Sequence, residues 1–117
     1  GGRGRGSRPP GEMNRTEARY AEHLEARRLA GEIVRWWFEP MSLRLAARTH
    51  YRIDFLVMLA DDRLEVHEVK GHWEDDARVK IKVAAAMFPF TFIAVFAAPK
   101  KDGGGWRFEN VTRRINP

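Results

Sequence analysis

Two short segments near the middle of the chain have the alternating pattern of β-strands. Residues 51–59 and 64–70 are rich in aliphatic and aromatic residues, and the three residues Asp61, Asp62 and Arg63 between them suit a tight turn. Side chains in a strand point alternately to opposite faces, so every second residue of each segment shares a face. We therefore predict a β-hairpin with an apolar row on each strand.

Ionisable residues continue these rows at one end of the predicted hairpin. Asp54 shares its face with Leu56, and Glu68 and Lys70 continue the row of Val66. Charges on an apolar row are costly unless they are paired or bind a metal ion. Two carboxylates and one amine at the edge of a sheet are also what metal-assisted phosphodiester hydrolysis requires. These three residues are therefore candidate catalytic residues, although the Glu-x-Lys pair could equally be an ordinary ion pair on one strand face.

The rest of the sequence predicts two helices and further strands. We expect a helix from Asn14 to about Ala30, strands at 33–39 and 41–46, a helix from about 74 to 88, a buried strand at 90–97 and a short edge strand at 106–111. Because a helix connects strand 64–70 to strand 90–97, these two strands should be parallel neighbours. The order α-β-β-β-β-α-β indicates an α/β fold in which helices flank a mixed β-sheet.

Composition limits the kind of protein this can be. The chain has 117 residues, a net charge of +5 and no cysteine, and no run reaches the roughly 18 apolar residues that span a bilayer. We expect residues 1–12, a Gly/Arg/Pro-rich tail, to be disordered and residues 13–117 to form one domain. The tail could bind nucleic acid loosely or act as a linker. The absence of cysteine makes the cytoplasm the default compartment and a membrane partner is not expected.

The order helix, hairpin, helix, with Asp54, Glu68 and Lys70 on the hairpin and a glutamate on the preceding helix, resembles the PD-(D/E)xK nuclease superfamily. Five further motifs begin at Thr16 (TEARY), Phe38 (FEP), Tyr51 (YRIDFLV), His67 (HEVKG) and Trp73 (WEDDARVK). Together they resemble phage endonuclease I-type Holliday-junction resolvases and a prophage protein family of unassigned function. The resemblance implies a restriction-endonuclease-like fold and Mg²⁺- or Mn²⁺-dependent hydrolysis of branched DNA by a homodimer, encoded by a phage or prophage and acting in the cytoplasm of the bacterial host. One position departs from the pattern, because Ile53 stands where the family usually has proline.

The resemblance also assigns roles to residues. It makes Glu17 the helical acid of the site, Asp54 and Glu68 the metal-binding pair, and Lys70 the catalytic lysine. The carbonyl of Val69 is a further candidate metal ligand. Glu17 also lies three residues after Asn14, where it could simply close a capping box at the start of the helix.

Three other residues are candidate DNA contacts. Lys80 and Lys82 lie on the second predicted helix, where lysines more often form a solvated face, and His72 lies in the loop after Lys70. His67 should point away from Glu68 by strand alternation, so we expect no metal role for it. Two other functions stay open: a nicking or end-processing nuclease on the same fold, and a non-catalytic nucleic-acid-binding accessory protein of a phage.

Overall fold

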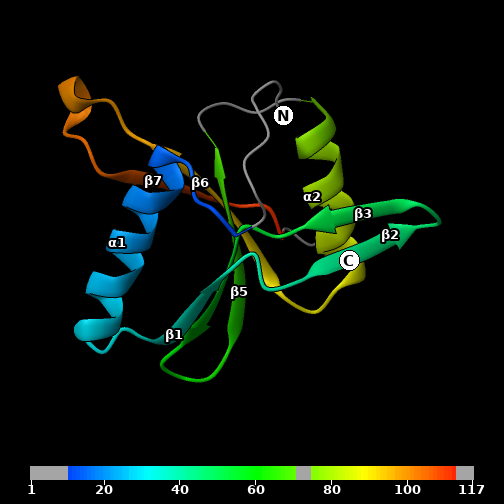
Figure 1. The fold of residues 1–117 in the computed structure, drawn as a ribbon, viewed down its shortest axis with the longest axis horizontal. Helices are drawn as coiled ribbons and strands as arrows, with labels where there is room; N and C mark the ends of the chain where they lie inside the picture. Colours follow the sequence, from blue (N-terminus) through cyan, green and yellow to red (C-terminus); the bar gives the residue numbers. More distant parts are fainter. Residues whose placement is uncertain (1–10, 71–74, 113–117) are drawn as a thin grey trace, which may run out of the picture.

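The structure is a computed structural model, and it describes residues 11–70 and 75–112. It contains a five-stranded sheet, a separate two-stranded hairpin and two α-helices (Figure 1). Residues 1–10 of the expected tail and the candidate DNA contact His72 lie outside the described residues. In chain order the elements are α1 (Arg15–Leu29), β1 (Ile33–Phe38), β2 (Ser42–Ala46), β3 (Thr49–Arg52), β4 (Phe55–Leu59), β5 (Leu64–Lys70), α2 (Asp75–Met87), β6 (Thr91–Ala97), the 3₁₀-helix η1 (Lys100–Asp102) and β7 (Trp106–Asn110).

The main sheet is mixed, with the strand order β1-β4-β5-β6-β7. Strands β1, β4 and β5 are antiparallel neighbours, and β7 is antiparallel to β6. Strands β5 and β6 are parallel, and α2 connects them, because parallel neighbours need a crossover rather than a tight turn. The predicted fold class, a mixed sheet flanked by helices, is confirmed, as is the parallel pair on either side of α2.

The prediction of one continuous strand over residues 51–59 is wrong. Strand β3 ends at Arg52 and pairs with β2, whereas β4 begins at Phe55 and pairs with β1 and β5. Ile53, between them, is fully buried and donates its backbone N–H to the Met41 carbonyl, with an N–O distance of 3.3 Å. The apolar pattern therefore continues through the point at which the chain leaves one sheet and enters another.

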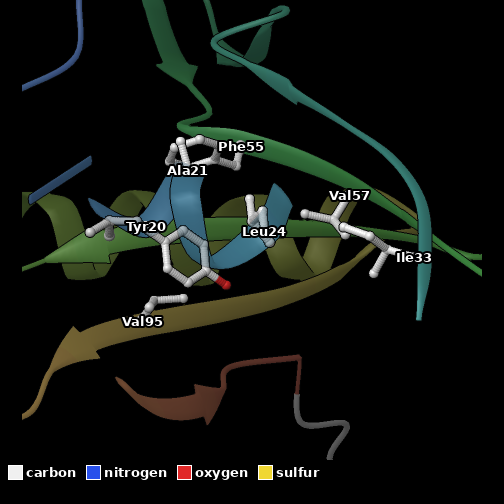
Figure 2. Packing of buried hydrophobic residues seen from close by; sticks show 8 residues of the cluster. Tyr20, Ala21, Leu24, Ile33, Phe55, Val57 and Val95 are labelled. Carbon is white, nitrogen blue, oxygen red and sulfur yellow. The ribbon is translucent and has the colours of Figure 1, made fainter. Parts of the chain in front are cut away.

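Helix α1 covers one face of the main sheet. Asn14 caps the helix as predicted, and the helix ends before Gly31, whose φ of 83° favours glycine. Figure 2 shows Tyr20 and Leu24 of α1 packed over the strand that carries Val95. This first core cluster consists of Tyr20, Ala21, Leu24, Ile33, Phe55, Val57, Val69 and Val95.

Helix α2 and the hairpin of β2 and β3 form a second core on the other face. Figure 1 shows the hairpin crossing α2 and extending away from the main sheet. The buried members of this cluster are Leu43, Tyr51, Ile53, Val66, Ile81, Ala84 and Phe92. Val66 and Val69 are three residues apart on β5, so their side chains point to opposite faces of the sheet. Each therefore belongs to a different cluster. Neither described helix has the length and apolarity that crossing a membrane would need.

Candidate functional site

Asp54 and Glu68 are neighbours where β4 begins and β5 approaches its end. The antiparallel register pairs Phe55 with His67, so the next position along places Asp54 opposite Glu68. The backbone N–H of Val69 donates to Oδ2 of Asp54 at 2.9 Å, which holds this carboxylate against β5. Asp54 is half-buried, and Glu68 is only 5% exposed. The hairpin between β4 and β5 therefore brings together the two acids that the sequence singled out.

Lys70 lies beside Glu68 on the same face of β5. Its Nζ is 3.1 Å from Oε2 of Glu68, and its side chain is 28% exposed. The predicted meeting of Glu68 and Lys70 is therefore present, in the form of an ion pair. A lysine that is paired with a buried acid and is still accessible can also face an approaching anion.

Tyr51 is a member of the site that the sequence analysis missed. Its hydroxyl donates to Oε1 of Glu68 at 2.6 Å, so each carboxylate oxygen of Glu68 has a partner. Burial, together with the negative charge of Glu68, raises the pKa of the Tyr51 hydroxyl well above its usual range and keeps it a donor. A continuous strand over 51–59 would have placed Tyr51 on the face opposite Asp54. The break at Ile53 removes that constraint, and no local sequence signal indicates it.

Glu17 occupies the first turn of α1 and is buried. Its Oε1 accepts the backbone N–H of Asn14 at 2.9 Å, and Oδ1 of Asn14 accepts the N–H of Glu17 at 2.7 Å. The capping-box role is thus present. The charge of Glu17 also raises the pKa of both Asp54 and Glu68, so the helix start adds a third negative charge to the surroundings of the pair.

The surroundings of Asp54 and Glu68 disfavour the charged form of both carboxylates. The pKa of Asp54 is raised well above its ordinary value, chiefly by burial and then by the charge of Glu68; the N–H of Val69 and the ammonium of Lys70 act in the opposite direction. Burial also raises the pKa of Glu68, against the lowering effects of Lys70 and Tyr51. Close carboxylates with too little compensating positive charge are a setting in which a bound cation is stabilising.

The donor set suits a hard divalent cation that keeps part of its water shell. Within residues 11–70 and 75–112, no three His, Cys, Asp or Glu side chains are placed to hold a metal ion by themselves. Asp54 and Glu68 supply two carboxylates, and each oxygen can accept more than one partner. The N–H and C=O of a strand residue point to the same side, so the Val69 carbonyl lies on the side of Asp54. Mg²⁺ is commonly held by one or two carboxylates and several waters, which fits this set.

His67 lies on the opposite face, as strand alternation predicts. Its Nδ1 is 2.6 Å from the Tyr20 hydroxyl and its Nε2 is 2.8 Å from Oε1 of Glu65. The side chain is 2% exposed, and both ring nitrogens have protein partners. A cavity of about 550 Å³ opens beside it, lined by His23, Ala26, Arg27, Glu32, Glu65, His67, Ile93 and Phe108. His67 is therefore a hydrogen-bonded core residue.

The candidate DNA contacts on α2 are both exposed. Nζ of Lys80 donates to the backbone carbonyl of His50 at 3.0 Å, which links α2 to the hairpin of β2 and β3. Lys82 is also on the surface. Neither lysine is among the groups that shift the pKa of Asp54 or Glu68 most strongly.

Comparison of the chain with protein-family models, with curated proteins and with solved structures finds no match.

The raised pKa of Asp54 predicts that this acid destabilises the metal-free fold at neutral pH. Below about pH 3 the carboxyl is mostly protonated in both states and imposes almost no penalty. As pH rises, the unfolded chain loses the proton first, so the penalty grows until the folded-state pKa is passed. We expect Asp54→Asn to raise stability by about 0.5–2 kcal/mol at pH 7.5 in EDTA, with almost no gain at about pH 3 or below. Thermal melts of both proteins across this range measure the effect.

Asp61→Asn is the matched control, because Asp61 is exposed and Arg63 lowers its pKa. This substitution should give no stabilisation at pH 7.5. Equal melting temperatures for the wild type and Asp54→Asn at pH 7.5 would contradict the assigned burial of this carboxylate.

Proposed function

We propose that this protein is a metal-dependent DNA endonuclease that hydrolyses phosphodiester bonds. The observation that carries the proposal is the meeting of Asp54, Glu68 and Lys70 at one end of the β4–β5 pair, with Lys70 still accessible. The arrangement combines a cation-binding pair of acids with an ammonium group that can face a phosphate. The motifs that resemble PD-(D/E)xK nucleases support the same reading.

Asp54 and Glu68 would hold a Mg²⁺ or Mn²⁺ ion, with the Val69 carbonyl as a third ligand and Glu17 as the further acid from α1. Such an ion neutralises phosphate charge and lowers the pKa of a bound water. The chain's own residues then orient the reaction. Val69 fixes the Asp54 carboxylate through its N–H, and Tyr51 fixes the Glu68 carboxylate through its hydroxyl. Lys70 places positive charge next to the scissile phosphate, where negative charge increases in the transition state.

Branched DNA, in particular a four-way junction, is the proposed substrate. This choice rests on the resemblance to junction resolvases, because a fold by itself does not determine a substrate. Junction resolution needs paired cuts in opposite strands, so a homodimer with two-fold symmetry is part of the same proposal. A nicking or end-processing activity on the same site is the second candidate.

A cleavage assay tests the proposal directly. The purified full chain is incubated with labelled linear, nicked and four-way DNA in Mg²⁺, Mn²⁺ or EDTA. We expect cuts that require the divalent ion, with the four-way DNA cut in preference to the linear duplex. Cleavage of nicked or linear DNA alone would favour the nicking or end-processing nuclease. Binding of all three DNAs without cleavage in either metal would refute the nuclease and favour a binding protein.

A further inference from the structure

The hairpin of β2 and β3 carries positive charge without any acid. Residues 42–52 contain three arginines and one histidine, and no Asp or Glu. The register pairs Arg44 with His50 and Ser42 with Arg52, and all four residues are exposed. The alternate residues Leu43 and Tyr51 are each only 6% exposed and pack in the second core. The hairpin thus buries one face against α2 and presents a basic face to solvent.

Among the residues that the structure describes, the hairpin arginines differ from most other arginines in having no polar or ring partner. Within the described residues, no ion pair, side-chain hydrogen bond or ring contact involves Arg44, Arg48 or Arg52. Six other arginines pair with acids or lie over aromatic rings, in the combinations Arg27 with Glu32, Arg28 with Glu25, Arg63 with Asp61, Arg19 with Trp106, Arg35 with Trp37 and Arg107 with Phe96. Like charges on one small surface repel each other, and binding a polyanion would relieve the repulsion.

The conformation of the hairpin tip also favours a binding role for its arginine. Arg48 has a φ of 60°, a left-handed conformation in which glycine or asparagine is less strained. An arginine therefore occupies a position where it has no polar or ring partner among the described residues and where the backbone favours another residue. Lys80 of α2 adds a further basic side chain beside the hairpin through its bond to the His50 carbonyl.

The basic face begins next to the candidate site. Arg52 is two residues before Asp54, so the Cα atoms of these two residues are at most about 7 Å apart. His50 and Arg52 lie two apart on β3, with Tyr51 between them. Tyr51 points to the buried side and reaches Glu68, so the basic face is on the other side of the hairpin, and Arg52 is its member nearest to Asp54 along the chain.

We propose that the basic face, formed by Arg44, Arg48, His50 and Arg52, binds the phosphate backbone of DNA and directs it to Asp54 and Glu68. This inference rests on the proposed nuclease function and adds the surface that holds the substrate. Arginine suits phosphate because its planar guanidinium can donate two parallel hydrogen bonds. A membrane surface fits less well, since the exposed large apolar residues are on other elements: Leu29, Val34, Val79, Val83, Met87 and Phe108.

The test measures DNA binding in EDTA, so that it does not depend on cleavage. Fluorescence anisotropy of labelled four-way and linear DNA is recorded from 50 to 200 mM salt for the wild type and Arg44→Gln/Arg52→Gln. We expect about a tenfold loss of affinity and a reduction of about 2 in the slope of log K against log salt. Arg48→Gln at the tip should reduce the slope by about 1.

Arg28→Gln/Arg63→Gln is the matched control, because it removes the same charge from two exposed arginines that are paired with acids. Its affinity should change less than twofold. Equal losses in both double variants, or no loss in the hairpin variants, would overturn the proposal. So would tighter binding of phosphatidylserine vesicles than of DNA, with only vesicle binding lost in the hairpin variants. If the protein does not cleave DNA but the hairpin variants still lose DNA affinity, the nuclease function is refuted and the DNA-binding surface is retained.

Discussion

Replacing Asp54 with asparagine is expected to abolish metal-dependent cleavage of DNA while DNA binding in EDTA stays within about twofold. The variant keeps an oxygen that can accept the Val69 N–H, so the local geometry should persist. It removes one of the two carboxylates proposed to hold the cation. We expect the single-turnover rate to fall by about 10³-fold, the scale seen when a group that stabilises a transition state is removed. Quenched cleavage of four-way DNA in Mg²⁺ gives the rate.

Lys70→Ala should reduce the rate to a similar extent, because it removes the ammonium that pairs with Glu68. Asp61→Asn and Lys101→Ala are matched controls at exposed positions outside the site, and both should cut at the wild-type rate. If Asp54→Asn and Lys70→Ala cleave normally, the assignment of the site is wrong, whatever nuclease activity the protein has.

Phe55→Ala should produce the largest loss of stability. Phe55 is fully buried immediately after Asp54 and contacts three aromatic rings, with centroid distances of 5.5 Å to Tyr20, 5.9 Å to Trp36 and 5.2 Å to Phe38. Truncation of a buried phenylalanine costs about 3–5 kcal/mol, because the cavity is only partly refilled. In a domain of this size we expect a decrease of more than about 10 °C in melting temperature. Circular dichroism melts in EDTA measure it.

Two comparisons make this prediction specific. Phe55→Leu should cost less than half as much, because most of the buried volume remains. Phe108→Ala removes an aromatic residue that is 47% exposed and should have a smaller effect than either change at Phe55. If Phe108→Ala lowers the melting temperature as much as Phe55→Ala does, the stability of the core does not depend on the contacts of α1 with β4.

The elements whose pattern is local were predictable. The Asn14 cap, the stop before Gly31, the turn between the candidate strands and the apolar run at 90–97 correspond to α1, the β4–β5 hairpin and the interior strand β6. Capping, turn chemistry and periodicity act over a few residues and can be read from them. The alternation that placed Glu68 and Lys70 on one face, and His67 on the other, is of the same kind.

The candidate site was predictable only in part. The acid pair followed from the register of one hairpin, which depends on a short turn between two strands. The hydrogen bond from Tyr51 to Glu68 did not follow, because it depends on where β3 ends. Likewise, the sequence shows the hairpin arginines, but not that they have no polar or ring partner among the described residues, since pairing is decided by residues far away in the chain.

The sequence by itself determined the type of most elements, their order and the side of the strand on which each candidate charge lies, because these depend on contacts between near neighbours. Only the tertiary structure decided that the chain changes sheets at Ile53, that Tyr51 reaches Glu68, and that a basic hairpin starts beside Asp54. The apolar alternation is the same whether a strand continues or joins a second sheet. The choice is made by which surface buries Ile53, Tyr51 and Leu43, and that surface is supplied by α2 and β6.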